Sequence, residues 1–168
     1  MKNLKILINL IMLMIFCAVM LFSCAQESEI TIELWDLADV IGKKIDLSNT
    51  VPYLSGQISD NFGITDDDVN QIIVLKEMDV NSSEILILIE AKDKETADLI
   101  EVNLKTYKAN KLNELKDYTA NPDNENQYYI VDDSEIMVRQ QYVFLAINKQ
   151  NKEINNIIKD YIKNNKTK

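Results

Sequence analysis

The stretch Glu84-Ile-Leu-Ile-Leu-Ile-Glu-Ala91 decides the fold, because five consecutive large apolar residues lie between two glutamates. Successive side chains of a strand point to opposite faces, so this strand is apolar on both faces and is predicted to lie in the interior of a sheet. A second apolar run, Gln71–Glu77, precedes it across the turn-like segment MDVNSS. The two runs predict a β-hairpin.

Two further strands, over 134–140 and 142–148, predict a second hairpin near the C-terminus. A long helix from Lys94 to about Lys116, capped by Asp93, joins the two hairpins. Its inward face is predicted to carry Ala97, Ile100, Leu104 and Tyr107.

Three more helical patterns complete the reading. The first spans Ile32–Ile45 with Thr31 as its N-cap, and the second is a short turn over Leu54–Phe62 that Gly63 closes. The apolar stripe of the first helix consists of Leu34, Leu37, Ala38 and Ile41. The last helix begins with Asn151 as its cap and carries a stripe of Ile154, Ile157, Ile158, Tyr161 and Ile162.

These elements predict an α+β fold. We expect a mostly antiparallel four-stranded sheet, made of two hairpins joined by a long helix, with helices packed on a face. The polar segment YTANPDNENQ (residues 118–127) is predicted to be a loop. The strand order does not follow from the pattern.

The N-terminus resembles a secretory signal of the lipoprotein type. Lys2 and Lys5 precede an apolar run of 17 residues, and the sequence Leu-Phe-Ser-Cys ends at Cys24. We therefore expect residues 1–23 to be a signal peptide, 24–31 a lipidated Cys24 with a short tether, and 32–168 one domain. The alternative is a leader kept as a membrane helix, since 17 apolar residues are at the lower limit for spanning.

Composition excludes several classes of function. The formal net charge is −9, and it becomes −11 if the leader with its two lysines is removed, so a basic nucleic-acid-binding surface is not expected. The chain has no histidine, and Cys17 would leave with the leader. Histidine catalysis, thiol nucleophiles and ordinary zinc sites are therefore not expected, nor is any cofactor.

The order of these elements resembles a known family. The motifs that carry the resemblance are Phe62-Gly63-Ile64, the acidic turn Asp66-Asp67-Asp68, Ser83-Glu84-Ile85, Ala91-Lys92-Asp93 and Tyr142-Val143-Phe144-Leu145. They are similar to those of small bacterial lipoproteins grouped as domain of unknown function 4358. Where that family often has Gly in the last hairpin, this chain has Gln140-Gln141, which predicts a longer turn. The resemblance implies fold and location but no activity.

Acidic residues are the candidates for chemistry. Glu84 and Glu90 could form a carboxylate pair of the glycosidase kind, or could simply mark the strand's two ends in solvent. Asp66-Asp67-Asp68 could bind a divalent cation, or could begin a helix with Thr65 as cap. The segment Asn121–Asp132 imitates the spacing of a calcium loop, but it has Asn126 where that loop needs glycine. We therefore assign no catalytic residue and no metal ligand.

Aromatic and basic residues are candidates for binding. Trp35 and the pair Tyr128-Tyr129 could stack on a ligand, but are expected to be half-buried core. A cluster of lysines ends the chain and could contact anionic lipid, or could complement the helix dipole. The cluster consists of Lys159, Lys163, Lys166 and Lys168.

These observations lead to one expected function and two alternatives. We expect a non-catalytic binding or interaction domain, anchored to lipid through Cys24 on the outer face of the bacterial cell membrane. Its candidate partners are an envelope protein or a small ligand, and not nucleic acid. The alternatives are a carboxylate-dependent hydrolase of cell-wall glycan and a structural accessory subunit, which an open edge strand would favour.

Overall fold

The computed structural model describes residues 30–116 and 122–165 of the chain. This described part contains five helices and five strands. In chain order they are α2 (Leu34–Gly42), β1 (Thr50–Pro52), α3 (Ser55–Phe62), β2 (Val69–Glu77), β3 (Ile85–Ala91), α4 (Lys94–Lys116), α5 (Pro122–Asp132), β4 (Ile136–Arg139), β5 (Tyr142–Ile147) and α6 (Asn151–Asn164). None of the helices in this described part is both long and apolar enough to cross a membrane.

The strands form one open antiparallel sheet in the order β1-β2-β3-β5-β4. Strand β3 lies at its centre, with β2 on one side and β5 on the other. The register sets Ile87 of β3 opposite Val74 of β2 and Leu145 of β5. The interior strand and both hairpins are therefore confirmed, and the resulting fold is α+β.

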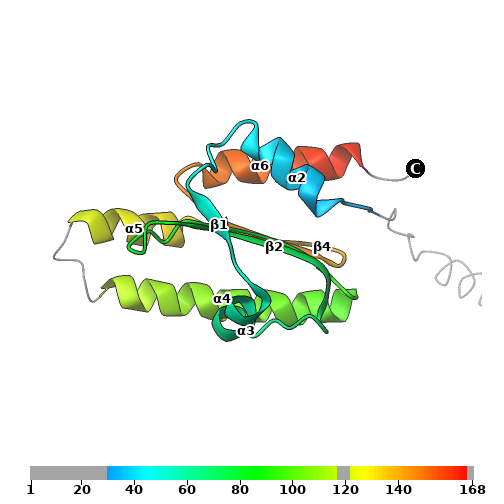
Figure 1. The fold of residues 1–168 in the computed structure, drawn as a ribbon, viewed down its shortest axis with the longest axis horizontal. Coiled ribbons are helices and arrows are strands. Elements are labelled where there is room, and N and C mark those ends of the chain that lie inside the picture. Colours follow the sequence, from blue (N-terminus) through cyan, green and yellow to red (C-terminus); the bar gives the residue numbers. More distant parts are fainter. Residues whose placement is uncertain (1–29, 117–121, 166–168) are drawn as a thin grey trace, which may run out of the picture. The chain divides into compact units, whose positions relative to one another are not determined.

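Helices α2 and α6 cover one face of the sheet (Figure 1). They pack on the side chains that β3 and β5 direct to this face, such as Leu88 and Phe144, which are fully buried. The predicted stripes of both helices are buried, with Tyr161 half-buried at the edge of the cluster. Helix α6 is thus part of the core.

Helices α3, α4 and α5 belong to the opposite face, which α4 crosses over its length (Figure 1). Residues of the alternate set on the central strands, such as Ile87 and Val143, point to this side and are fully buried. The predicted inward face of α4 is confirmed by buried Ala97, Ile100 and Leu104. Asp93 caps this helix, because its carboxylate accepts the backbone N–H of Thr96 at 2.7 Å.

The prediction of a four-stranded sheet covered on a face is wrong in two respects. The sheet has five strands, since the short β1 pairs with the outer side of β2. Its helices lie on both faces, which form two separate apolar clusters. The physical reason is that β3 is apolar on both faces, and each apolar face must be covered.

Local details also differ from the predictions. Glu33, not Thr31, is the N-cap of α2, and Gln150, not Asn151, is that of α6. The segment predicted as a loop contains most of helix α5, whose Tyr128 packs into the apolar cluster on the α4 side. The second hairpin has a two-residue turn rather than a longer one, because Gln140 adopts φ 53° without glycine.

The outer edge of β1 offers no free backbone donor along its three residues. Across the β1–β2 pair, the backbone N–H of Tyr53 donates to the carbonyl of Val74, and that of Met78 donates to the carbonyl of Asn49. Backbone groups alternate in direction along an antiparallel strand, so those of Thr50 and Pro52 point away from β2. The N–H of Thr50 donates to the carbonyl of Leu47 at 3.1 Å, and proline has no N–H. This edge is therefore closed to an added strand.

Candidate functional site

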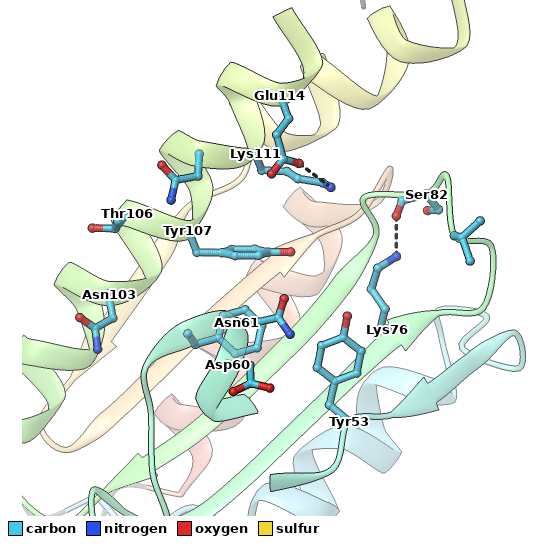
Figure 2. A pocket seen from close by; sticks show the side chains of 13 residues that line it. Tyr53, Asp60, Asn61, Lys76, Ser82, Asn103, Thr106, Tyr107, Lys111 and Glu114 are labelled. Atoms are coloured by element: carbon cyan, nitrogen blue, oxygen red, sulfur yellow. Dashed lines mark hydrogen bonds and ion pairs between the residues drawn. The ribbon is translucent and has the colours of Figure 1, made fainter. Parts of the chain in front are cut away.

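A hollow of about 480 Å³ lies between α3, α4 and the end of the β2–β3 hairpin (Figure 2). Strand alternation places Lys76 on the α4 side of the sheet, two residues after buried Val74. Tyr53 follows β1 and reaches the same side. Helix α4 supplies the opposite wall.

Three aromatic rings form one wall of this pocket. Phe62, the last residue of α3, is buried and stacks on Tyr53, with ring centroids 6.3 Å apart. The ring of Tyr107 meets Phe62 edge-on, with centroids 4.8 Å apart. Gly63 allows this arrangement, because it ends α3 at φ 62°, a left-handed conformation that glycine adopts without strain.

Lys76 extends into the pocket from β2 (Figure 2). Its Nζ donates to the backbone carbonyl of Ser82 at 2.5 Å and more weakly to that of Glu77 at 3.4 Å. Partial burial lowers the pKa of Lys76, and the positive charge of Lys111 lowers it further. The two ammonium groups are therefore close enough to influence each other.

Helix α4 presents a polar stripe to the pocket, made of Asn103, Thr106, Asn110, Lys111 and Glu114. Lys111 and Glu114 form an ion pair at 3.1 Å, visible at the upper rim in Figure 2. From the same helix Tyr107 reaches further in, and burial raises its pKa to about 12. Its hydroxyl therefore keeps its proton at physiological pH and can donate a hydrogen bond.

The arrangement offers several groups that can bind a small molecule. The pocket contains amides, hydroxyls, two lysines, the two carboxylates of Asp60 and Glu114 and an aromatic wall, but no cysteine or histidine. Within the described residues, no group of three or more acidic, histidine or cysteine side chains could hold a metal ion. What the pocket can supply is hydrogen-bond donors and an apolar surface, which is how small-molecule sites orient a ligand.

The carboxylates considered from the sequence do not converge. Glu84 is 16% exposed, accepts a hydrogen bond from Asn148 at 2.7 Å and pairs with Lys149 at 3.2 Å. Glu90 lies at the other end of β3, where the register places it opposite Gln71 of β2 and Tyr142 of β5. Six residues of extended strand separate the two by about 20 Å. They mark the two ends of the strand and do not form a catalytic pair.

The acidic turn Asp66-Asp67-Asp68 does not begin a helix, so that interpretation is wrong. It leads directly into β2 as a turn. The carboxylate of Asp68 accepts both the N–H of Thr65 at 2.8 Å and its hydroxyl at 2.7 Å, and these bonds lower the pKa of Asp68. Asp67 is exposed and pairs loosely with Lys92 at 3.8 Å.

The segment whose spacing resembles a calcium loop is not a loop in the structure. Pro122–Asp132 is helix α5, so these residues do not form the turn that a calcium loop requires. Asn121 lies outside the described residues.

The aromatic and basic candidates lie elsewhere on the molecule. Trp35 is 67% exposed on α2, so the expectation that it is half-buried is wrong, and Tyr129 is 56% exposed. Lys159 pairs with Glu135 at 3.7 Å. Cys24, Lys166 and Lys168 lie outside the described residues. Of the described candidates, Trp35, Tyr129 and Lys159 do not line the pocket.

The pocket lies in a segment of the chain that matches a known protein family. Residues 43–148 match the family model described as Domain of unknown function (DUF4358). The chain belongs to this family. The predicted membership of the domain of unknown function 4358 family is thereby confirmed, and the described residues that line the pocket fall within the matched part. No curated protein and no solved structure matches the chain.

Sequence reasoning missed the pocket, although two signals pointed to it. Lys76 is a charged residue that directly follows the apolar run Ile72–Leu75. On the long helix, Asn103, Thr106 and Asn110 recur at the three- and four-residue spacing of one helix face. Uncharged polar residues on one stripe of a charged helix are a signature that could have been used.

Proposed function

We propose that this DUF4358 protein is a lipid-anchored, extracytoplasmic binding domain without a catalytic role, which holds a small polar ligand in the pocket between α3, β2 and α4. One observation carries this proposal. The hydroxyl of Tyr107 and the ammonium group of Lys76 reach into one hollow beside an aromatic wall (Figure 2). Polar groups that converge over an apolar surface are typical of a small-molecule site.

The proposed anchor rests on the sequence that ends at Cys24. In the structure, the backbone N–H of Ile30 donates to the side chain of Gln140 at 3.1 Å, and Ile30 is buried. The domain therefore holds the chain from residue 30 onward. Six residues from Cys24 to Ile30 reach at most about 20 Å when extended. A lipid on Cys24 would keep the domain close to the membrane surface.

The two alternatives receive less support from the geometry. A glycan hydrolase needs two carboxyl groups placed about one scissile bond, and Glu84 and Glu90 lie at opposite ends of β3. Two other carboxylates, Asp60 of α3 and Glu114 of α4, line the pocket, and Glu114 pairs with Lys111 at 3.1 Å. An accessory subunit that docks by adding a strand would find no backbone donor on β1 at Thr50 and Pro52, so it would have to use the other edge strand, β4.

A recovery experiment tests the proposal. The full chain would be extracted from its own membranes in mild detergent, denatured, and the released small molecules identified by mass spectrometry. Thr106→Trp fills the pocket from an exposed position of α4. Leu99→Trp is the matched control, because Leu99 is exposed on the same helix but does not line the pocket.

The expected result is a compound that wild type and Leu99→Trp retain and Thr106→Trp loses. Identical profiles for all three proteins, with both variants folded by circular dichroism, would contradict a ligand-binding role for this pocket.

A further inference from the structure

The inner part of the pocket is rich in hydrogen-bond donors. Lys76 Nζ carries three N–H groups, of which two point to the carbonyls of Ser82 and Glu77. The third is available to a ligand. Tyr107 adds a hydroxyl that stays protonated, and the hydroxyl of Tyr53 points into the same space (Figure 2).

A second positive charge lies beside these donors. Lys111 influences Lys76 electrostatically across the pocket and forms an ion pair with Glu114 at the rim. The side chain of Glu114 is 62% exposed, and an exposed pair of this kind contributes little to stability. Lys111 can therefore turn from Glu114 to a bound group at small cost.

The formal charge of the whole chain is −9, yet two lysines, Lys76 and Lys111, line this hollow together with the carboxylates of Asp60 and Glu114. Two ammonium groups in a partly desolvated site repel each other. A negatively charged group placed between them would remove that repulsion and accept the unused N–H bonds. Hydrogen bonds between charged partners are also the strong ones.

We propose that the pocket binds one oxyanion group, a carboxylate or a phosphate of a small ligand, between Lys76 and Lys111, with the hydroxyls of Tyr53 and Tyr107 as neutral donors. This inference rests on the proposed binding function and adds the chemical class of the ligand. A cationic ligand would meet two like charges, and a neutral ligand would leave them unrelieved.

The site makes affinity depend on pH in a defined direction. Burial and Lys111 lower the pKa of Lys76, whereas Glu77, Asp79 and Glu84 act against that shift. A bound oxyanion favours the charged form and so raises the pKa of Lys76. By linkage, the affinity for the oxyanion should be constant while Lys76 is protonated in the ligand-free protein. It should fall once the pH rises past the pKa that Lys76 has without ligand.

The test uses the full lipidated chain in detergent micelles with ¹³Cε-labelled lysine. Inorganic phosphate, acetate and the uncharged isostere acetamide would each be titrated at constant ionic strength, with chloride as the balancing anion. The lysine resonances would be assigned by single Lys→Gln variants. Saturable shifts at Lys76 and Lys111, and not at Lys105 or Lys43, are expected for an oxyanion.

Variants at the two lysines give the matched comparison. Lys76→Gln and Lys111→Gln should each weaken the binding of the preferred anion about tenfold or more, as expected when a charge-assisted hydrogen bond is lost. Lys105→Gln changes the same charge on the same helix, at a position whose side chain is 61% exposed and paired with Glu101, and should leave affinity unchanged. Lys111 lies at the surface of α4, so Lys111→Gln should fold normally. It therefore provides the test if Lys76→Gln is poorly folded.

Each outcome decides the inference. Saturation by phosphate alone assigns a phosphate ligand, and saturation by acetate assigns a carboxylate. Equal effects of acetate and acetamide, equal and linear shifts of all lysines, or no shift at all would overturn it. Suppose that the titration gives one of these negative results. If the recovery experiment still shows a compound that Thr106→Trp loses, only the oxyanion assignment is wrong. If it shows no such compound, the proposed binding function is wrong as well.

Discussion

The side-chain hydroxyl of Tyr142 accepts a hydrogen bond of 3.0 Å from the backbone N–H of Ile32, a residue 110 positions earlier in the chain. Both residues are about 1% exposed. This bond ties the segment before α2 to the central sheet, and it uses a donor at the start of the helix that no water can reach.

Replacing Tyr142 with Phe should therefore lower the free energy of unfolding by about 1–3 kcal/mol, because the buried N–H of Ile32 would lose its partner. Urea denaturation would measure the change. Tyr129→Phe removes a hydroxyl from an exposed ring and should stay within about 0.5 kcal/mol of wild type. Equal stability of Tyr142→Phe and wild type would mean that this bond contributes nothing net.

Two glycines of the α3 region should respond to alanine with opposite signs. Gly63→Ala should destabilise by about 1–2 kcal/mol, because φ 62° is left-handed, although the added Cβ would come no closer than 3.6 Å to Asn103. Gly56→Ala should stabilise by about 0.5–1 kcal/mol, since this helical position has open space around it. Thermal unfolding of the pair would test the assignment, and shifts of the same sign would contradict it.

Ile158→Ala should destabilise by about 2–5 kcal/mol, because Ile158 is fully buried between α6 and the sheet. Asn156→Ala is the control on the exposed side of the same helix and should change stability by no more than about 0.5 kcal/mol. Chemical denaturation of both would measure this. A small loss for Ile158→Ala would show that α6 is only loosely docked.

Tyr107 should make the fold sensitive to alkali. Its pKa of about 12 in the folded protein lies above the ordinary value of 10.0, so its contribution is complete below pH 10 and is lost as the pH rises toward 12. The loss amounts to about 1.4 kcal/mol per pH unit in that window. Tyr107→Phe should lack this component. Parallel stability curves for wild type and variant between pH 10 and 12 would count against a buried, protonated Tyr107.

Cys24→Ala should abolish incorporation of labelled fatty acid and leave the protein as an uncleaved precursor. The physical reason is that the thiol of Cys24 is the proposed site of lipid attachment, and two acyl chains hold a protein to a membrane far better than one. Metabolic labelling with gel analysis would measure both effects. Labelling that persists in this variant would refute the proposed anchor, and Cys17→Ala serves as the control that should still be labelled.

The central architecture could be predicted because its pattern is strong and local. Five alternating Ile and Leu residues leave no polar face on β3, and the buried stripe of α6 repeats with helical spacing. The same feature of β3 also held information that we did not use. A strand that is apolar on both faces needs cover on both, so the two-sided helix packing follows from the residues that predicted an interior strand.

The missed elements are those that tertiary contacts stabilise. The residues PDNENQ favour turns, and helix α5 forms there because its apolar end, including Tyr128 and Val131, packs into the cluster beneath the sheet. Strand β1 has only three residues and includes Pro52, so no periodicity can reveal it. It exists because β2 offers an unpaired edge.

The pocket was missed for a different reason. Its residues come from the segment after β1, from α3, from β2 and the turn that follows it, and from α4, and only their packing brings Tyr53, Lys76 and Tyr107 together. Each is ordinary in its own element, since a lysine near a strand end and a tyrosine on a helix face occur in most domains. A site made of common residues is visible only when the distances between elements are known.

The blocked edge of β1 has a consequence for how the protein behaves among its own copies. Tethering to a bilayer confines molecules to a thin layer, and their local concentration there far exceeds that in free solution. At such a high local concentration, an exposed strand edge would favour edge-to-edge pairing of sheets from neighbouring molecules. Because Thr50 spends its N–H on Leu47 and Pro52 has none, the protein can be displayed densely on a surface without polymerising through β1.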